Sequence, residues 1–533
     1  MPPLIQTPPP TQTVPSAPAP PPPRQVEVIR PQEVRSLPGQ LDAVPVFNSN
    51  SPEVIQEEGI LVSAFPPAGM EIPEAHLNFP LEGRFDLFAH HIARGADPDD
   101  TRTLFLGMIV HNPGDEAVTL DVLQAVSYLS QDAPFIDLPS YVANPLGTVF
   151  AGPGSRAVND ILRGQRQTHW PAQVIIPPGE NHLLMNAPIP LRRLTVATDG
   201  TLPPGYIIPP PPNVATPTTA STSLSGGLSS DSLDSNDSTS NSTTTVSSTN
   251  QVVVSPRPPA HRDVPINGRS TLMHLSSSGQ VYVASLAMYA PKATGGAERV
   301  PTLVEWEELL KTSDLAGPRD RTPTSPDTSF FARFLYGRVA GIAQGSQWTA
   351  LATDSPDVDY LSIPKPGEEF SYVISTVDHN TFGTEQIQSA PMLVRYPDTA
   401  YRAHGNYGVK YDISLPLYNT TESTQRVSVL FQTPIQDEDL EGALRFREPP
   451  DPQVFFRGTV RLRFTDNLGI PQTRYLHVVQ HRGQQGDPLI QLVMPSGDRR
   501  LVEVQFIYPP DATPPQVITV QTMQDPNIIE VSN

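Results

Sequence analysis

Apolar and polar residues alternate along much of the chain, most regularly over residues 407–432. Single, mostly polar neighbours separate six apolar side chains there, namely Tyr407, Val409, Tyr411, Ile413, Leu415 and Leu417. A period of two is typical of a strand with one buried face. After Asn419 and seven further polar residues, the alternation returns at Val427, Val429 and Phe431. The pattern predicts two strands that pair as a hairpin.

A near copy of this segment lies at residues 106–124. Its first half alternates through Leu106, Met108 and Val110, and its second half through Val118, Leu120 and Val122. Both copies place an asparagine at the exit of the first strand and branched apolar residues on the return. The chain is therefore predicted to contain two related β units.

Low-complexity sequence separates these units. Residues 1–36 form a proline-rich leader, and residues 207–262 a linker or insert dominated by Ser, Thr, Asp, Asn and Gly. Neither composition can bury a core, so both segments are predicted to be disordered. The first β-rich unit is expected at 37–206 and the second at 263–533. The predicted fold is all-β and mainly antiparallel, with two sandwich-like units and few short helices.

Helical periodicity is confined to short segments. Residues 302–312 place Leu303, Trp306, Leu309 and Leu310 on one face, which predicts a helix. Residues 123–130 and 158–164 predict two shorter helices. Residues 270–274 and 280–289 predict a second hairpin around a Ser-Ser-Ser-Gly turn.

Composition narrows the functional classes. Proline accounts for 64 of 533 residues, which favours strands and loops over helical bundles. The absence of cysteine excludes disulfides, thiolate catalysis and cysteine-ligated metal sites. The net charge of −20 argues against nucleic acid as a partner. No run reaches the ~18 apolar residues of a membrane helix, and residues 1–30 show neither the basic nor the apolar region of a signal peptide.

The motifs of common enzyme classes are missing, including G-x-S-x-G, the P-loop, G-x-G-x-x-G and H-E-x-x-H. The pair His90-His91 suggests a metal site, but adjacent side chains of a strand point to opposite faces, which favours a structural role. Acidic loops at residues 97–100, 354–359 and 437–441 offer the oxygen ligands that calcium takes, with Asp357 and Asp359 at alternate positions. The EF-hand spacing is missing, so we predict no cofactor and keep calcium as the alternative.

One hairpin has an unusually basic face for so acidic a chain. Over residues 454–482, Val460, Leu462 and Phe464 occupy one face. The candidate binding residues of the other face and its surroundings are Arg457, Arg461, Arg463, Arg474, His477, His481 and Arg482. Arginine is well suited to carboxylate and sulfate groups, so this face is a candidate site for an anionic polysaccharide or an acidic protein surface. The simpler interpretation is an edge hairpin whose charges prevent aggregation between sheets.

Several segments in the same order resemble a known family. They are LPGQLDAVPVFNSNSPE, LLMNAPIP, SSSGQVYVASLAMYAP, LYGRVAGIAQGSQW, NYGVKYDISLPLYN and YPPDATPPQ, after a proline-rich leader. Together they are similar to a cyanobacterial family of uncharacterised proteins, classed as a domain of unknown function, over residues 37–525. The resemblance implies an exported protein of the periplasm or cell surface, although no leader peptide is visible. It transfers no functional residue, because the family has no agreed activity.

These observations predict a non-catalytic β protein of the cell envelope or medium that has a structural role or binds glycan or a protein partner. The alternatives are a glycan-active hydrolase, whose carboxylates the sequence does not locate, and a cytosolic assembly protein. Sugar-binding sandwiches often expose tryptophan for stacking. The three tryptophans here, Trp170, Trp306 and Trp348, are expected to be buried.

Overall fold

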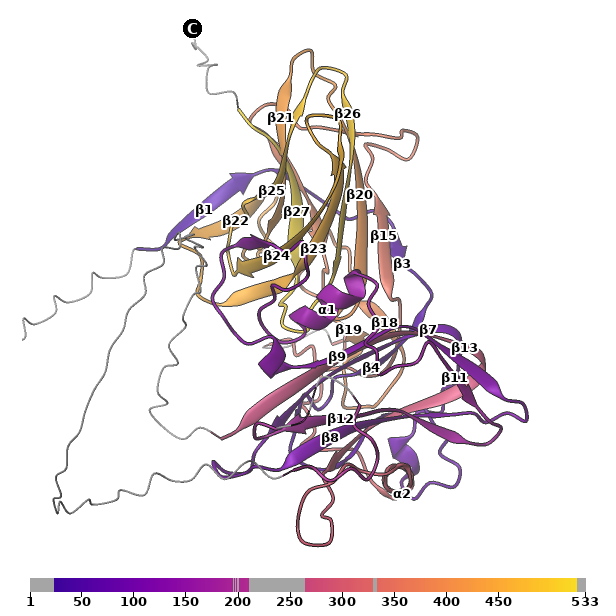
Figure 1. Cartoon of the computed structure of the whole chain (residues 1–533). Helices are drawn as coiled ribbons and strands as arrows, with labels where there is room; N and C mark the ends of the chain where they lie inside the picture. Colours follow the sequence, from indigo (N-terminus) through magenta and orange to yellow (C-terminus); the bar gives the residue numbers. More distant parts are fainter. Residues whose placement is uncertain are drawn as a thin grey trace, which may run out of the picture.

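The computed structural model describes residues 24–194, 196, 198, 201–209, 264–328 and 333–524. It confirms the predicted mostly β, antiparallel-rich class. Figure 1 shows two β units stacked one on the other, the lower drawn mainly in purple and pink and the upper mainly in orange and yellow. The predicted leader up to residue 23 and the linker over 210–263 lie outside the described residues.

The first unit is a sandwich whose two sheets share the long strand β13 (Ile266–Tyr289). The first half of β13 pairs with β7 (Leu81–Arg94) and β9 (Val118–Leu129). Its second half pairs with β8 (Thr103–His111) and β6 (Gly59–Ser63). The other strands of this twelve-stranded assembly are β4 (Pro45–Ser49), β5 (Val54–Ile55), β11 (Gln173–Ile176), β12 (Asn181–Pro190), β14 (Ala340–Gln344), β18 (Ala390–Arg395) and β19 (Arg402–Ala403).

The continuity of β13 contradicts the hairpin predicted around Ser-Ser-Ser-Gly. The register of β13 against β7 shifts between Ser277 and Val281, and the strand continues into the second sheet. An irregularity of this kind bends a strand without reversing it. Alternation and a glycine-containing turn signal could not distinguish a bent strand from a hairpin.

The second unit is a sandwich of an eight-stranded and a five-stranded sheet. The larger sheet contains β10 (Tyr141–Ala143), β24 (Pro471–His481), β23 (Val454–Thr465), β26 (Arg499–Ile507), β20 (Lys410–Tyr418), β15 (Gln347–Leu351) and β3 (Gln40–Leu41), with β16 (Leu361–Ser362) beside β20. The smaller sheet contains β2 (Glu33–Arg35), β17 (Glu369–Ile374), β27 (Gln516–Thr522), β21 (Gln425–Gln432) and β25 (Pro488–Met494). At its side, β1 (Val26–Pro31) pairs with β22 (Ala443–Glu448).

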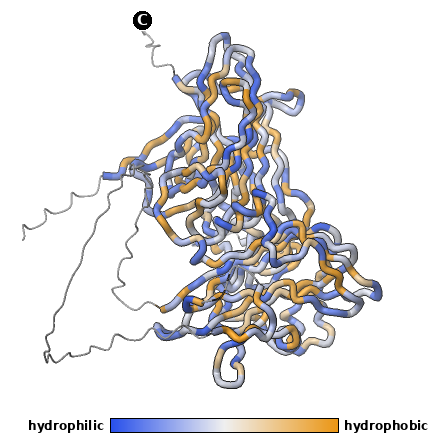
Figure 2. Tube along the Cα trace, viewed as in Figure 1, coloured by the Kyte–Doolittle hydropathy of each residue, from blue (hydrophilic) through white to orange (hydrophobic). Residues whose placement is uncertain are grey.

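The interior of each sandwich is apolar. In the second unit, the alternating residues Tyr411, Ile413, Leu415 and Leu417 of β20 are all fully buried in its core, as the period of two predicted. Figure 2 shows the same separation along the trace, with hydrophobic segments on the strands and hydrophilic segments in many of the loops. Burial of these side chains is the main source of stability in such a fold.

The two units are copies of one topology. In the first unit, neighbouring strands follow the order β11-β9-β13-β7-β4, and in the second the order β25-β21-β27-β17-β2. In the opposite sheets, β12 pairs with β8 as β26 pairs with β20. The registers also agree, because Ile176 faces Val118 in the first copy and Met494 faces Gln425 in the second. The relationship predicted between the two segments is thus visible in the structure.

Neither predicted Asn-turn hairpin forms. β8 pairs with β12 and β13, whereas β9 pairs with β11 in the other sheet of the first sandwich. Likewise, β20 and β21 lie in opposite sheets of the second sandwich. Each Asn-containing turn is therefore an arch between two sheets. Alternation shows which face of a strand is buried, but it does not show which strand is its neighbour.

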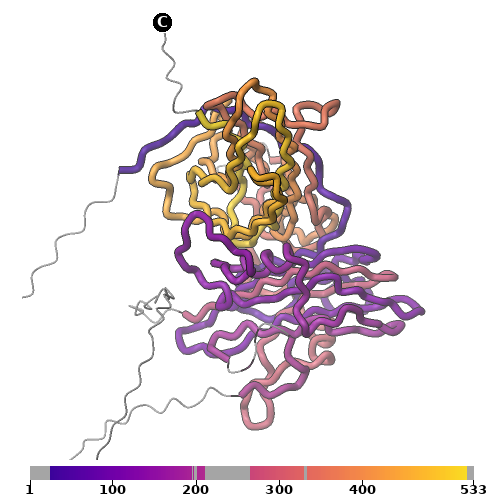
Figure 3. Tube along the Cα trace, turned by 45° about the horizontal axis from the view of Figure 1, so that its top comes forward, coloured from indigo at the N-terminus to yellow at the C-terminus, as the bar shows by residue number. Residues whose placement is uncertain are grey.

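The units exchange segments at their boundary. The N-terminal strands β1, β2 and β3 belong to the second unit, although residues up to 36 were predicted as leader and residues from 37 as part of the first unit. Figure 3 shows this indigo segment running along the upper unit. β10 extends from the first unit and pairs with β24 at the edge of the second. Conversely, β14 comes from the C-terminal half of the chain but pairs with β4 of the first unit.

Two α-helices cover the sandwiches. α2 (Leu303–Thr312) matches the predicted helix; Thr302 caps its N-terminus, and its fully buried Trp306 packs over Gly107. α1 (Ser155–Leu162) corresponds to the helix predicted near 158–164 and contacts strands of both units. The helix predicted at 123–130 is wrong, because Leu123–Leu129 belongs to β9. Single 3-10 turns occur at Pro73–Ala75 and Ser130–Asp132.

Within the described part of the chain, no helix has the length and apolarity needed to cross a bilayer.

Candidate binding cleft between the two units

A cleft of about 750 Å³ lies where the two units meet. Three parts of the chain line it: the end of β4 with the residues that follow it, the connection between α2 and β14, and β19 with loops of the C-terminal half. The residues on these three walls include Asn48, Asn50 and Glu53, then Arg319–Arg321 and Leu335–Val339, then Val377, Ala403–Tyr407, Gln436 and Ala512–Pro514. Pockets of this size accommodate small organic ligands or part of a polymer.

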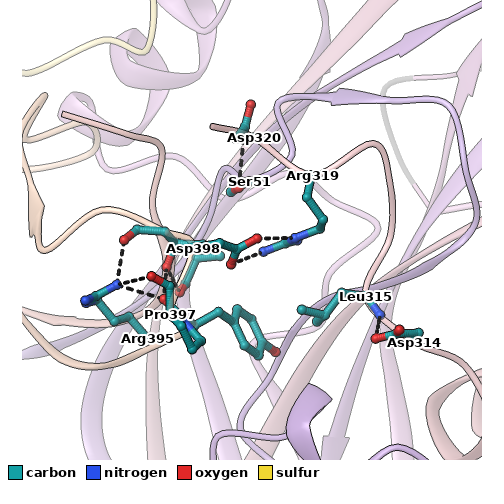
Figure 4. Close-up of polar contacts among 11 residues, drawn as sticks. Ser51, Asp314, Leu315, Arg319, Asp320, Arg395, Pro397 and Asp398 are labelled. Atoms are coloured by element: carbon teal, nitrogen blue, oxygen red, sulfur yellow. Dashed lines mark hydrogen bonds and ion pairs between the residues drawn. The ribbon is translucent and has the colours of Figure 1, made fainter. Parts of the chain in front are cut away.

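Both carboxylates that line the cleft are bound to one arginine. The guanidinium of Arg338 forms an ion pair with Glu53 and another, at 3.1 Å, with Asp320. Asp320 also accepts a hydrogen bond of 2.8 Å from the hydroxyl of Ser51 (Figure 4). One guanidinium therefore holds both carboxylates at the wall of the cleft through charge-assisted contacts.

A second ion pair holds the connection that forms the middle wall. Nε of Arg319 lies 2.8 Å from Asp398, and a parallel hydrogen bond of 3.0 Å completes a bidentate pair (Figure 4). Burial is the largest influence and raises the pKa of Asp398, but the hydrogen bonds and charge of Arg319, together with the charge of Arg395, bring the pKa below its ordinary value. Nearby, Arg395 donates to the backbone carbonyls of Tyr396 and Thr399 at 2.8 Å and 2.7 Å. This wall is therefore fixed by charge-assisted contacts.

Asn48 and Asn50 bring unpaired amides to the cleft. They are 3% and 5% exposed, and their Oδ1 atoms are buried without a hydrogen-bond partner among the described residues. Buried polar atoms are usually satisfied in folded proteins, and an unsatisfied one costs roughly 1–3 kcal/mol. A ligand that offers hydrogen-bond donors would satisfy both atoms.

Another group of unsatisfied polar atoms lies at β19, beside the cleft, and only its member His404 lines the cleft wall. Oδ2 of Asp378 is 3.4 Å from Nδ1 of His404 and 3.5 Å from Nε of Arg402, but none of these atoms makes a hydrogen bond within the described residues. Tyr336 donates a hydrogen bond of 2.6 Å to the carbonyl of Asp378, and its ring lies 4.8 Å from that of His404. Burial and then the charge of Arg402 lower the pKa of His404 to about 4, so this imidazole is neutral at pH 7.

His90 and His91 have separate structural partners. Nδ1 of His90 contacts the hydroxyl of Ser270 at 2.8 Å, whereas His91 contacts Ser49 at 2.8 Å and the carbonyl of Pro52 at 2.9 Å. Burial is the largest cause that lowers their pKa values, to about 4 and about 3. These contacts match the structural interpretation of the pair.

The acidic loops considered for calcium are engaged in other contacts. Asp100 binds Arg102, whose hydrogen bonds lower the pKa of Asp100 to about 2. Asp359 lies 3.1 Å from Arg499, and the carboxylate of Glu438 accepts a hydrogen bond of 3.0 Å from the backbone N–H of Phe382. Among the described residues, no three His, Asp or Glu side chains are grouped as ligands of one ion.

The predicted basic hairpin exists as β23 and β24, and Val460, Leu462 and Phe464 face the core. Its seven candidate residues do not form one continuous cationic surface. Three of them form ion pairs: Arg457 with Asp511, Arg463 with Glu503 and Arg482 with Asp451. Arg461 donates a hydrogen bond to Gln505, and Arg474 lies over the ring of Phe464. His477 is fully buried, and His481 contacts the carbonyl of Pro452. Binding of an anionic polymer by this face remains a prediction.

One acid near the cleft has a raised pKa. Burial raises the pKa of Asp511 to about 6, although Arg457 opposes the shift. The neighbours Pro510 and Ala512 line the cleft, but Asp511 does not, and its carboxylate lies 3.1 Å from Arg457.

All three tryptophans are buried, as expected, so none is exposed for stacking on a sugar.

Sequence reasoning did not identify the cleft residues. Asn48 and Asn50 stand in the motif NSNSP, and Asp378 and His404 lie far away in sequence, with no spacing that relates them. The only local signal is the pair of asparagines at the end of a strand, which is common in turns.

Comparison with known proteins supplies a family and no activity. The model of a family described as a protein of unknown function (DUF3370) matches residues 32–522. No curated protein matches the chain. Because the match spans most of its length, the chain belongs to this family of uncharacterised proteins.

Proposed function

We propose that this protein is a non-catalytic glycan-binding protein, and that the cleft between its two β units holds an uncharged segment of a sugar chain. The observation that carries the proposal is the unpaired amide oxygens of Asn48 and Asn50 on the wall of the cleft. Sugar hydroxyls are donors as well as acceptors, so they can satisfy amide groups of either orientation.

Most charges of the cleft are paired with each other, and this supports an uncharged ligand; the exposed Arg321 is the exception among the described lining residues. Arg338 is bound to Glu53 and Asp320, and Arg319 is bound to Asp398. A strongly anionic or cationic ligand would have to compete with these pairs. A hydroxyl-rich ligand can bind beside them without breaking them.

The same pairs support binding over hydrolysis. Glycoside hydrolysis generally needs one carboxylic acid that can donate a proton and a second carboxylate across the scissile bond. The two acids that line the cleft, Glu53 and Asp320, share the guanidinium of Arg338, so neither carboxylate is free to act on a bound sugar.

We also propose that the protein acts in the cell envelope or outside the cell, as the family resemblance implies. Cell fractionation followed by immunoblotting tests this location. Recovery in the cytosolic fraction alone would contradict it and leave the binding proposal in place.

Titration of the full chain with neutral oligosaccharides tests the proposed function. We would screen gluco-, manno- and galacto-configured tri- to hexasaccharides and measure the affinity of any hit by isothermal titration calorimetry. The double variant N48A/N50A should bind about tenfold or more weakly, because two hydrogen bonds are lost. The matched control N467A changes an exposed asparagine in the turn between β23 and β24 and should bind normally. Absence of binding across the whole set, or equal affinity of N48A/N50A, would overturn the proposal.

A further inference from the structure

We infer that Asp378, Arg402 and His404 form a subsite of the cleft that recognises one hydroxyl group of a sugar ring and so determines which sugar binds. The inference rests on the proposed function, because it assigns the group of the ligand that this wall contacts. It is carried by three buried polar atoms that lie together and lack hydrogen bonds.

The three atoms form a compact cluster around one carboxylate oxygen. Oδ2 of Asp378 lies 3.4 Å from Nδ1 of His404 and 3.5 Å from Nε of Arg402. Asp378 and His404 are 8% and 7% exposed, so bulk water does not solvate them freely. Atoms at such separations do not hydrogen-bond well to each other, but they can share a small polar group placed beside them.

The chemistry of the cluster selects that group. The carboxylate of Asp378 needs a donor, whereas Nε–H of Arg402 needs an acceptor. A bound cation would be repelled by Arg402, and a bound anion by Asp378. A hydroxyl group is neutral and meets both needs, because its oxygen accepts from Arg402 while its hydrogen is donated to Asp378.

The position of the cluster connects it to the cleft. His404 and Tyr336 both line the cleft, and the hydroxyl of Tyr336 donates to the backbone carbonyl of Asp378. This hydrogen bond and the ring contact of Tyr336 with His404 hold the wall in place. A neutral imidazole carries one donor and one acceptor nitrogen, and a hydroxyl can pair with either of them.

The test compares the best oligosaccharide of the neutral set with its O-methylated derivative, on wild type and on D378N. O-methylation removes the hydroxyl donors and keeps the oxygen acceptors. Wild type should prefer the free sugar by well over tenfold, because methylation also removes the donors to Asn48 and Asn50. D378N should lose about tenfold of this preference and keep the part that depends on the two asparagines. D466N makes the same change in the exposed turn between β23 and β24 and should keep the preference.

The outcomes separate this inference from the proposed function. If an oligosaccharide binds, depends on Asn48 and Asn50, and shows the same preference in D378N as in wild type, the subsite is refuted and the cleft proposal stands. If no oligosaccharide binds, both fail. Because D378N could lower stability, its melting temperature is measured in parallel, and H404Q serves as a second variant that should weaken binding of the free sugar.

Discussion

Asn112 and Asn419 make the same contacts in the two copies of the β unit. Nδ2 of Asn112 donates to the carbonyls of Glu116, Ile176 and Pro177, and Nδ2 of Asn419 donates to those of Ser423, Met494 and Pro495. The backbone carbonyl of each asparagine accepts a 2.9 Å hydrogen bond from a glycine N–H, that of Gly179 for Asn112 and that of Gly497 for Asn419. Both asparagines are fully buried. Each one ties the arch between two sheets to a neighbouring turn.

The first prediction concerns these arches. Asn112→Ala and Asn419→Ala should each lower the free energy of unfolding by about 2–3 kcal/mol, because buried carbonyls lose their donor. Urea titration measures the change. The exposed neighbours Pro113→Ala and Thr420→Ala are the controls and should stay within about 0.5 kcal/mol of wild type. If one substitution lowered the free energy of unfolding strongly and the other only slightly, the two copies would not be equivalent.

The second prediction concerns acid stability. His477 is fully buried with both ring nitrogens unpaired among the described residues, and burial followed by the charge of Arg457 lowers its pKa to about 4. The unfolded chain binds a proton at an ordinary pKa of 6.5, so stability is lost as the pH falls from about 6.5 to about 4.

His477→Leu should remove this contribution. Between pH 6 and pH 4.5, the stability of the variant should fall less steeply than that of wild type, by up to about 1.4 kcal/mol per pH unit. Thermal unfolding across this range checks the slope, with the partly exposed His481→Leu as the matched control. A slope identical to that of wild type would refute the prediction.

The third prediction concerns the N-terminal segment. Leu37 is fully buried in the core of the second unit; its carbonyl accepts a 2.8 Å hydrogen bond from Gln386, and that of Pro38 accepts one of 3.0 Å from Trp348. Removal of residues 1–41 should therefore destabilise the protein by about 3 kcal/mol or more. Removal of residues 1–23 is the control and should have little effect on the melting temperature. Equal melting temperatures would mean that the segment is not part of the second core.

The fourth prediction concerns the basic hairpin. The double variant R461E/R463E should weaken retention on an immobilised acidic polysaccharide, because it replaces two positive charges with negative ones. It also removes the 2.7 Å ion pair between Arg463 and Glu503 and places a glutamate opposite Glu503. Column retention at low and physiological salt provides the measurement, since screening reduces such contacts. R426E reverses an exposed arginine of β21 as the control. Retention unchanged from wild type would dismiss this face as an anion site.

The sequence predicted the positions of strands better than it predicted which strands pair with each other. Alternation over residues 407–417 located β20 and its buried face, because burial on one side of a sheet imposes a period of two. The two Asn turns were recognised as related, yet they were interpreted as hairpins. Their true role depends on hydrogen bonds to Pro177 and Pro495, which lie 65 and 76 residues away.

The cleft was beyond sequence reasoning for the same physical reason. Asn48 and Gln436 become walls of one cavity only after the segments of the two units have packed together. No periodicity or motif in the sequence predicts such a contact between distant segments. The geometry of a strand, by contrast, was enough to expect that His90 and His91 point to opposite faces, and they have separate partners in the structure.

Hydrogen–deuterium exchange with and without a neutral oligosaccharide tests the central claim most directly. The account predicts slower exchange in residues 48–53, 403–407 and 510–514 when the sugar is present, and no such slowing in N48A/N50A. Slowing confined to the outer faces of the sheets, or no change at a saturating sugar concentration, would contradict it.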